Sequence, residues 1–163
     1  MEQYQQVYNT LTNLSIPYEV VEHPPVFTTE EADKWIIGKE GVRSKTLLLT
    51  NQKKTTYYLI VMNGEKRLDM VHLADILQEK RLSFASPQRL MNKMALIPGC
   101  VSIFGLLNNA EHDIKVYIDQ QILSEGFISF HPNDNTKTIF ITMEDMFKFL
   151  KAIGYEYTII DLK

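Results

Sequence analysis

Two strand-forming runs joined by a short polar turn constrain the fold of this chain more than any other feature of its sequence. The runs Lys45–Thr50 and Tyr57–Met62 are rich in β-branched, aromatic and other apolar residues, and the polar turn Asn51–Lys54 follows the first of them. This arrangement predicts a β-hairpin. Further strands are predicted at Tyr18–Glu22, Lys115–Ile118, Phe127–Phe130, Thr138–Ile141 and Tyr157–Ile160.

Capping residues mark the helices that lie between these strands. Thr28 and Glu31 have the spacing of a capping box, and Ser86 stands before a proline at the first helical position. Asp69 caps a further helix, whose inner face we expect to carry Val71, Leu73, Ile76 and Leu77. Helices are predicted at Gln3–Leu14, Thr28–Trp35, Asp69–Lys80, Ser86–Met94 and Thr142–Gly154.

This order of strands and helices predicts an α+β fold, a curved mixed sheet flanked by helices. No linker, repeat or low-complexity tract interrupts the chain, so we expect residues 1–163 to form a single domain. Its length is sufficient to bury a substantial core.

Composition narrows the class of protein. Hydrophobic residues make up 45% and charged residues 23%, which is typical of a folded globular domain. The apolar runs are too short to span a bilayer and the start lacks the features of a secretory signal, so we expect a cytoplasmic protein. The lone Cys100 excludes an internal disulfide and a cysteine metal cluster, and the scattered histidines predict no metal site. No cofactor is expected.

The charge distribution is uneven. The net charge is −3, but residues 34–93 hold twelve basic and five acidic residues, a net +7, and the rest of the chain carries −10. A basic segment on an acidic protein predicts a phosphate-backbone footprint, and the alternative is an ordinary solvated surface.

Three segments are candidates for chemistry, although the chain contains no P-loop and no Gly-x-Ser-x-Gly nucleophile elbow. Lys45 stands where a strand begins, although such lysines commonly extend to solvent. Leu96–Asn109 combines an apolar run with two glycines, whose backbone N–H groups can hold an oxyanion; the alternative is a tight turn into a core strand. Phe130–Thr136 is a polar loop between two strands, and its alternative is a β-hairpin turn.

The order of these segments resembles a known family, the free-standing aminoacyl-tRNA editing domains of the YbaK and prolyl-tRNA-synthetase-associated type. Among its groups the chain is most similar to the ProXp-ala (PrdX-like) Ala-tRNA(Pro) deacylases, and the His131–Thr136 loop favours that group. The resemblance extends from about residue 16 to the end. The matching segments are Glu22–Thr28, Ser44–Leu47, Arg81–Ser86, Pro98–Asn108 and Phe130–Thr136.

The resemblance implies a single-domain fold of the YbaK type, with a barrel-like curved sheet, and a trans-editing activity. The implied reaction is the size-selective, substrate-assisted hydrolysis of the ester that joins alanine to tRNA(Pro), which makes the protein a carboxylic ester hydrolase. A synthetase for proline cannot exclude the smaller alanine, so a second sieve is useful. The implied partners are mischarged tRNA(Pro), bound at its acceptor end, and prolyl-tRNA synthetase.

The resemblance also assigns residues. Lys45, Gly99 and His131 match the catalytic positions: the lysine would hold the terminal nucleotide or the ester carbonyl, the Gly99 region would offer N–H groups to the oxyanion, and the histidine would lie near the aminoacyl group. The expected substrate-binding residues are Thr46, Pro98, Ser102, Phe104, Gly105 and Asn108, and Phe104 is the first candidate for a pocket wall.

Three positions depart from the family's usual residues. Thr46 replaces an asparagine, Ile103 a proline, and Ala95 a glycine. They leave the amino-acid specificity open, so a deacylase for Cys- or Ser-tRNA is one alternative. A non-catalytic tRNA-binding or regulatory module is the other.

Overall fold

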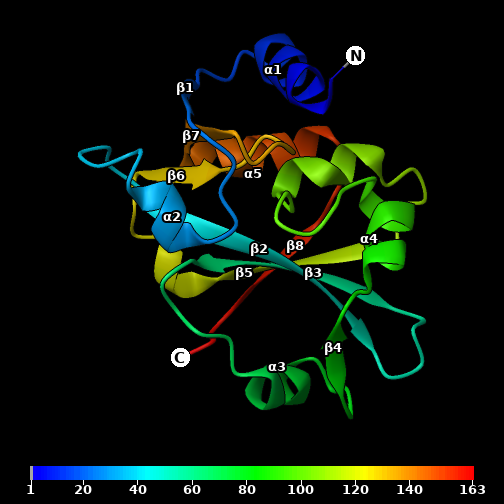
Figure 1. Ribbon diagram of the computed structural model, residues 1–163. Coiled ribbons are helices and arrows are strands. Elements are labelled where there is room, and N and C mark those ends of the chain that lie inside the picture. The colour runs from blue at the N-terminus through cyan, green and yellow to red at the C-terminus, as the bar shows by residue number, and fades with distance from the viewer. Residues whose placement is uncertain (1) are drawn as a thin grey trace.

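The β2–β3 hairpin lies at the centre of an eight-stranded mixed sheet in the computed structural model, which describes residues 2–163 (Figure 1). The strand order is β1-β7-β6-β2-β3-β5-β8, and β4 pairs with β2 outside this path. The strands are β1 Glu19–Glu22, β2 Val42–Asn51, β3 Tyr57–Asn63, β4 Leu82–Phe84, β5 Ile114–Asp119, β6 Phe127–Phe130, β7 Lys137–Thr142 and β8 Tyr157–Ile160.

Five α-helices and two 3₁₀ helices flank this sheet among the described residues, which confirms the predicted α+β class. Thr28, Asp69, Ser86 and Thr142 all accept a backbone hydrogen bond at the start of a helix, as expected of N-caps. The helices are α1 Gln3–Asn13, α2 Thr29–Asp33, α3 Met70–Ile76, α4 Pro87–Met94, η1 Ile103–Asn108, η2 Gln120–Ile122 and α5 Met143–Ala152.

The central hairpin is buried on both faces. On β3, Leu59 and Val61 point into the larger hydrophobic cluster, whereas Tyr58, Ile60 and Met62 point into a smaller one. A strand covered on both sides needs apolar residues at successive positions, which explains the unbroken apolar run of β3.

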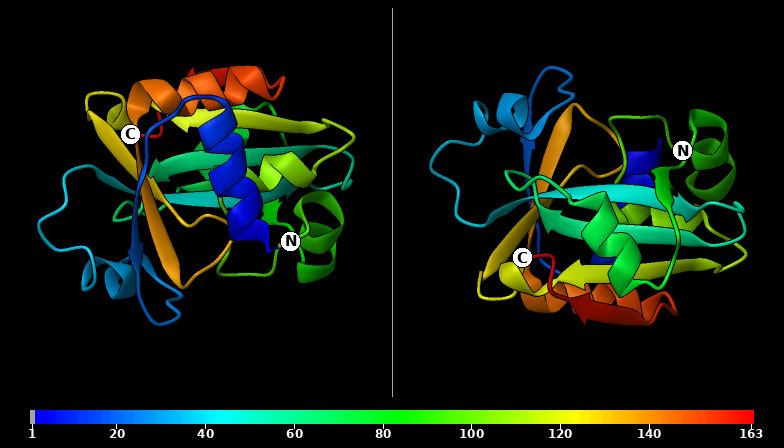
Figure 2. Two further views of the ribbon diagram at one scale, coloured as in Figure 1. Left: turned by 90° about the horizontal axis from the view of Figure 1, so that it is seen from above. Right: turned by 90° about the horizontal axis from the view of Figure 1, so that it is seen from below.

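Helices cover the two faces unequally. Helix α1 crosses above the sheet between α5 and η1, and it contributes Val7 and Leu11 to the larger cluster (Figure 2, left). Helix α3 lies against the opposite face, where Leu73 and Ala74 join the smaller cluster (Figures 1 and 2). Between these two layers, strands β2 and β6 pair over only two residues and then separate.

Strand β2 has two different neighbours along its length. Val42 and Arg43 pair in parallel with Ile128 and Ser129 of β6, and from Ser44 onward the strand pairs antiparallel with β3. Two side-chain bonds hold the first junction: the Ser44 hydroxyl donates to the Ser129 carbonyl, and the Ser129 hydroxyl donates to the Val42 carbonyl at 3.0 Å. Beyond it, β2 and β6 diverge.

Two local predictions differ from the structure, and one strand is missing from those predicted. Val71 is 82% exposed, because Leu73 and Ala74 supply the buried face of the short helix α3. Strand β4 was not predicted, since three residues are too few for a recognisable pattern. The alternative of a core strand after Pro98–Gly99 is also wrong: Ser102 accepts the Phe104 N–H and begins the 3₁₀ helix η1 instead.

Among the described helices, none is both long enough and apolar enough to cross a membrane.

Ala95 ends helix α4 in a left-handed conformation, with φ 56° and ψ 36°. The resemblance implies a glycine at this position, and a Cβ in this conformation costs about 1 kcal/mol or more. The sequence departure at Ala95 is therefore a strained C-cap.

We expect Ala95→Gly to raise the free energy of unfolding by about 1 kcal/mol, because glycine adopts the left-handed region without strain. Chemical denaturation measures this. The matched control is Ala152→Gly at the end of α5, which should lower the stability instead. Equal destabilisation by both substitutions would contradict the assignment.

Candidate active site

A pocket of about 670 Å³ lies where β2 and β6 diverge. Lys45 through Leu48 of β2 form one side, and Phe130 with His131 at the end of β6 form another. The turn at Pro98–Gly99 also borders the pocket. The structure thus brings together the three predicted catalytic residues, Lys45, Gly99 and His131, with the predicted Thr46 and Pro98.

The residues that line the pocket fall into a buried group and an exposed group. Leu48, Leu90 and Phe130 are at most 4% exposed and form an apolar deep end. Phe27 and Phe84 are 68% and 59% exposed and form the rim. Both phenylalanines stand in segments that carried the family resemblance, but nothing in the sequence pattern showed that their rings are exposed at a pocket.

Lys45 is a half-buried cation without a counterion. Its side chain makes no hydrogen bond or ion pair with any part of the chain that the structure describes. Burial lowers the pKa of the Lys45 ammonium group, and no charged neighbour offsets this effect. An anionic or strongly polar ligand group would therefore replace solvation that this cation has lost.

The Pro98–Gly99 segment is a β-turn closed by a hydrogen bond of 3.1 Å from the Cys100 N–H to the Ile97 carbonyl. Proline at the second position and glycine at the third, with φ +90°, are the features of a type II turn. The turn uses the Cys100 N–H, whereas those of Gly99 and Val101 make no hydrogen bond within the described chain. These two N–H groups are the candidates for holding an oxyanion.

Gly99 has a second reason to be glycine. A Cβ atom at this position would lie 3.1 Å from Cδ1 of Phe27, so the ring packs directly against the turn. The Phe27 ring at the rim of the pocket is therefore in contact with the turn that carries the candidate N–H donors.

His131 is a neutral imidazole in this structure. Its Nδ1 lies 2.9 Å from the Lys137 carbonyl oxygen, which can only accept, so Nδ1 carries the proton and Nε2 remains an acceptor. Burial, assisted by the nearby His23, lowers the pKa of His131 below the usual 6.5, and it outweighs the hydrogen bond to Lys137 and the charge of Asp134, which raise it. The neutral form therefore persists at pH 7.

His23, which the sequence analysis placed in the matching text without a role, supports this arrangement. Its Nδ1 donates to the Pro24 carbonyl at 2.9 Å, and its Nε2 accepts from the Thr138 hydroxyl at 2.8 Å. The His23 and His131 rings pack edge to face, with their centroids 6.2 Å apart. Fixed by two bonds, His23 limits the movement of the His131 ring.

Four residues predicted to bind substrate lie behind the pocket and do not border it. Phe104 is fully buried against Phe130 and Phe149, so it is a core residue and not the expected pocket wall. A Cβ on Gly105 would approach Met94 Cε at 2.6 Å, so this glycine allows η1 to pack on α4. The remaining two, Ser102 and Asn108, bond to other parts of the chain, through Asn133 and through Gln3.

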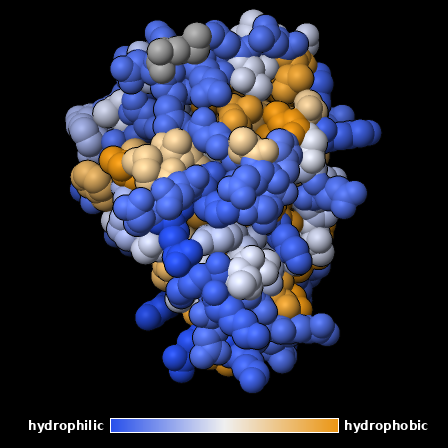
Figure 3. Space-filling view, turned by 90° about the vertical axis from the view of Figure 1, so that its right-hand side faces the viewer, coloured by the Kyte–Doolittle hydropathy of each residue, from blue (hydrophilic) through white to orange (hydrophobic). Residues whose placement is uncertain are grey.

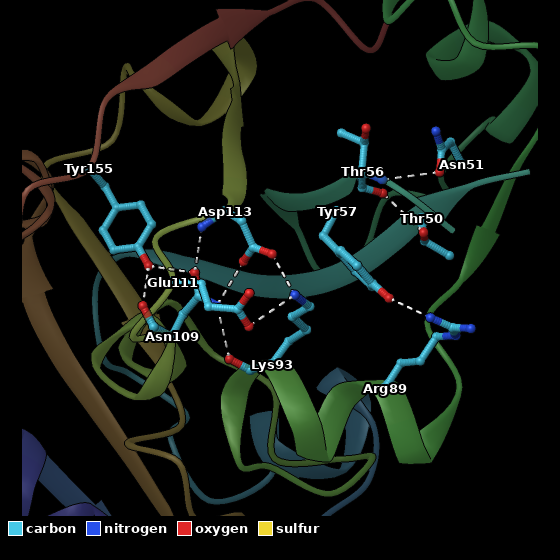
Figure 4. Close-up of polar contacts among 10 residues, drawn as sticks. All are labelled: Thr50, Asn51, Thr56, Tyr57, Arg89, Lys93, Asn109, Glu111, Asp113 and Tyr155. Carbon is cyan, nitrogen blue, oxygen red and sulfur yellow. Dashed lines mark hydrogen bonds and ion pairs between the residues drawn. The ribbon is translucent and has the colours of Figure 1, made fainter. Parts of the chain in front are cut away.

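Several cations of the basic segment, residues 34–93, are engaged by other residues of the fold. Its tip is the β2–β3 turn, where Lys53 is exposed. The face of the molecule seen in Figure 3 is mostly hydrophilic. On α4, in contrast, Lys93 pairs with Glu111 and Asp113, and Arg89 donates to the Tyr57 hydroxyl at 2.8 Å (Figure 4). Ion pairs also occupy Lys39, Arg43 and Lys66. The exposed basic residues outside these pairs, such as Lys53, remain the candidates for phosphate contacts.

The arrangement is suited to hydrolysis of an ester attached to a nucleotide. It offers an unpaired cation, two free N–H donors, a neutral imidazole acceptor and an apolar deep end. A water molecule could attack a carbonyl held at the N–H groups without a protein nucleophile.

Comparisons with known proteins agree with this chemistry. The family model described as the aminoacyl-tRNA editing domain matches residues 23–149. The prolyl-tRNA editing protein ProX of Acetoanaerobium sticklandii is 35% identical over 162 residues and covers 99% of both chains. The prolyl-tRNA synthetase associated domain-containing protein 1 of Mus musculus is 32% identical, covering 91% of this chain and 89% of that one.

A solved structure shows the same fold. The crystal structure of a candidate trans-editing enzyme for prolyl tRNA synthetase superposes with a TM-score of 0.76 at 20% identity, covering 100% of this chain and 98% of that chain. Together with the family match, this confirms the predicted fold and the predicted enzyme class of aminoacyl-tRNA hydrolases. The chain belongs to the aminoacyl-tRNA editing domain family.

Proposed function

We propose that this protein is a trans-editing deacylase that hydrolyses Ala-tRNA(Pro). The observation that carries the proposal is the convergence of Lys45, Gly99 and His131, from three distant segments, on one pocket. The prolyl-tRNA editing protein that matches the chain over its full length supports tRNA(Pro) as the substrate. Residues 1–163 would form one editing domain that acts in the cytoplasm, where tRNA is charged, with prolyl-tRNA synthetase as a second partner.

The division of the pocket places the two ends of the substrate. The apolar deep end at Leu48, Leu90 and Phe130 would take the alanyl side chain. The exposed rings of Phe27 and Phe84 at the rim would stack on the terminal base, an interaction worth about 1–3 kcal/mol per base. Lys45 lies on the wall between Ser44 and Thr46 and would hold a phosphate or ester oxygen.

The chemical step needs no protein nucleophile. A water oxygen bonds to the ester carbonyl carbon, and the carbonyl oxygen becomes an oxyanion that the Gly99 and Val101 N–H groups stabilise. When this intermediate collapses, the ester C–O bond breaks and the leaving ribose oxygen takes the proton released by the water. The free hydroxyl of the same ribose would relay that proton, and His131 Nε2 would accept a hydrogen bond from the α-amino group of alanine.

The size of the deep end would set the specificity. Closely packed apolar walls exclude additional ring atoms at a cost of about 1–3 kcal/mol per excess methylene, so proline would be rejected. A hydroxyl adds little volume, and an apolar pocket rejects it only weakly. Serine would therefore be a secondary substrate.

We expect purified protein to hydrolyse Ala-tRNA(Pro) at least about tenfold faster than Pro-tRNA(Pro), equivalent to roughly 1.4 kcal/mol of discrimination. The measurement is a deacylation panel with Ala-, Ser-, Cys- and Pro-tRNA(Pro). If Cys-tRNA(Pro) were hydrolysed fastest, the protein would be a deacylase for cysteine and the proposal of alanine would be wrong. Binding of tRNA without turnover of any substrate would instead indicate a non-catalytic module.

We expect Lys45→Ala to lower the deacylation rate at least about tenfold, because the half-buried cation that holds the substrate is lost. Circular dichroism should remain that of the wild type, since Lys45 makes no hydrogen bond or ion pair with the described chain. Lys115→Ala is the matched control, an exposed strand lysine on β5. Near-normal turnover by Lys45→Ala would remove this residue from the mechanism.

A further inference from the structure

Gln3, in the first turn of α1, uses its side-chain amide to join three segments that are far apart in the sequence. Its Nε2 donates to the Ala95 carbonyl at 2.6 Å. Its Oε1 accepts from the amide of Asn108 at 2.9 Å and from that of Asn133 at 3.1 Å. Both lone pairs of the oxygen are therefore in use.

Two of these partners lead to the catalytic residues. Asn133 belongs to the loop that follows His131, and its N–H donates to the His131 carbonyl at 2.9 Å. Its side-chain oxygen also accepts from Ser102 at 2.9 Å, and both residues are buried. Asn133 has a left-handed backbone with φ 60°, a strained conformation that the surrounding bonds must maintain.

The third partner, Ala95, leads to the oxyanion turn. It is the strained C-cap of α4 and stands four residues before Gly99. Asn108 adds a second bond to this region, because its amide also donates to the Met94 carbonyl at 2.9 Å. Through Gln3, the end of α4 and the His131–Asn133 loop are thus held to the same side chain.

Attachment of α1 does not require these bonds. Val7 and Leu11 are fully buried in the larger hydrophobic cluster and fasten the helix by apolar packing. Gln3 also lies outside residues 23–149, the part that matches the family model, while its three partners lie inside it. Its bonds therefore add a connection between α1 and the editing core that packing alone would not supply.

We propose that Gln3 is a positioning residue of the active site, which holds the Gly99 turn and the His131 loop in their relative places. This inference rests on the proposed deacylase function. Gln3 does not border the pocket, so it would act on the reaction only through its partners. A small displacement of either loop would separate the N–H donors from the imidazole acceptor.

The test compares Gln3→Ala, Gln3→Glu and the control Gln5→Ala, which removes an exposed glutamine from the same helix. We expect Gln3→Ala to lower kcat for Ala-tRNA(Pro) about tenfold or more with little change in KM, because binding at the rim is unaffected. Gln3→Glu keeps an acceptor for both asparagine amides and should recover part of kcat. Gln5→Ala should match the wild type.

A double-mutant cycle identifies the route. If Gln3 acts through the His131 loop, Gln3→Ala and Asn133→Ala together should lower kcat by less than the product of the two separate effects. Multiplicative effects would mean that the two residues act independently, which would contradict the proposal.

A second readout needs no substrate, and it separates failure of this inference from failure of the proposed function. In Gln3→Ala, NMR titration should show the pKa of His131 rising toward 6.5, because a loosened loop admits more water to this partly buried ring. If the wild type fails to deacylate, the proposed function is wrong. The titration still tests whether Gln3 holds the His131 loop in place. An unchanged His131 titration with unchanged kcat, at a temperature where the variant is folded, would overturn the inference.

Discussion

Two side-chain hydrogen bonds, from the Ser44 hydroxyl to the Ser129 carbonyl and from the Ser129 hydroxyl to the Val42 carbonyl, hold the junction of β2 and β6 at the point where the sheet opens. They close the parallel pairing after Arg43, and from there β2 turns to β3 while β6 ends at Phe130. Had the parallel pairing continued in the same register, Lys45 would have paired opposite His131. The divergence instead leaves both residues beside a pocket, so the location of the site follows from strand pairing.

The isolation of Lys45 distinguishes this pocket from the rest of the molecule. Other largely buried lysines lie near carboxylates: Lys66 Nζ is 3.1 Å from Asp119, and Lys137 Nζ is 3.8 Å from Asp134. Those pairs satisfy a buried cation within the fold. Lys45 lacks such a partner among the described residues, which destabilises the free protein and favours binding of an anionic or polar ligand group.

The sequence predicted those features that depend on near neighbours. Ser86 and Thr142 cap their helices because each partner N–H lies three residues away, and the turn around Gly99 follows from its proline and glycine. The side-chain direction of Phe104 was not predictable, since η1 turns it into the core by contacts with α4 and α5. Gln3 could not be recognised either, because one of its partners is 130 residues away.

The central claim is that one pocket at the divergence of β2 and β6 holds the aminoacyl-adenosine end of the substrate. A stable amide analogue, alanine linked to 3′-amino-3′-deoxyadenosine, tests it by NMR titration of isotope-labelled protein. The account predicts the largest shifts at the Gly99 and Val101 N–H groups, the Lys45 ammonium group and the His131 ring. Shifts concentrated elsewhere, such as on the α5–β8 face around Lys148 and Tyr157, would contradict it.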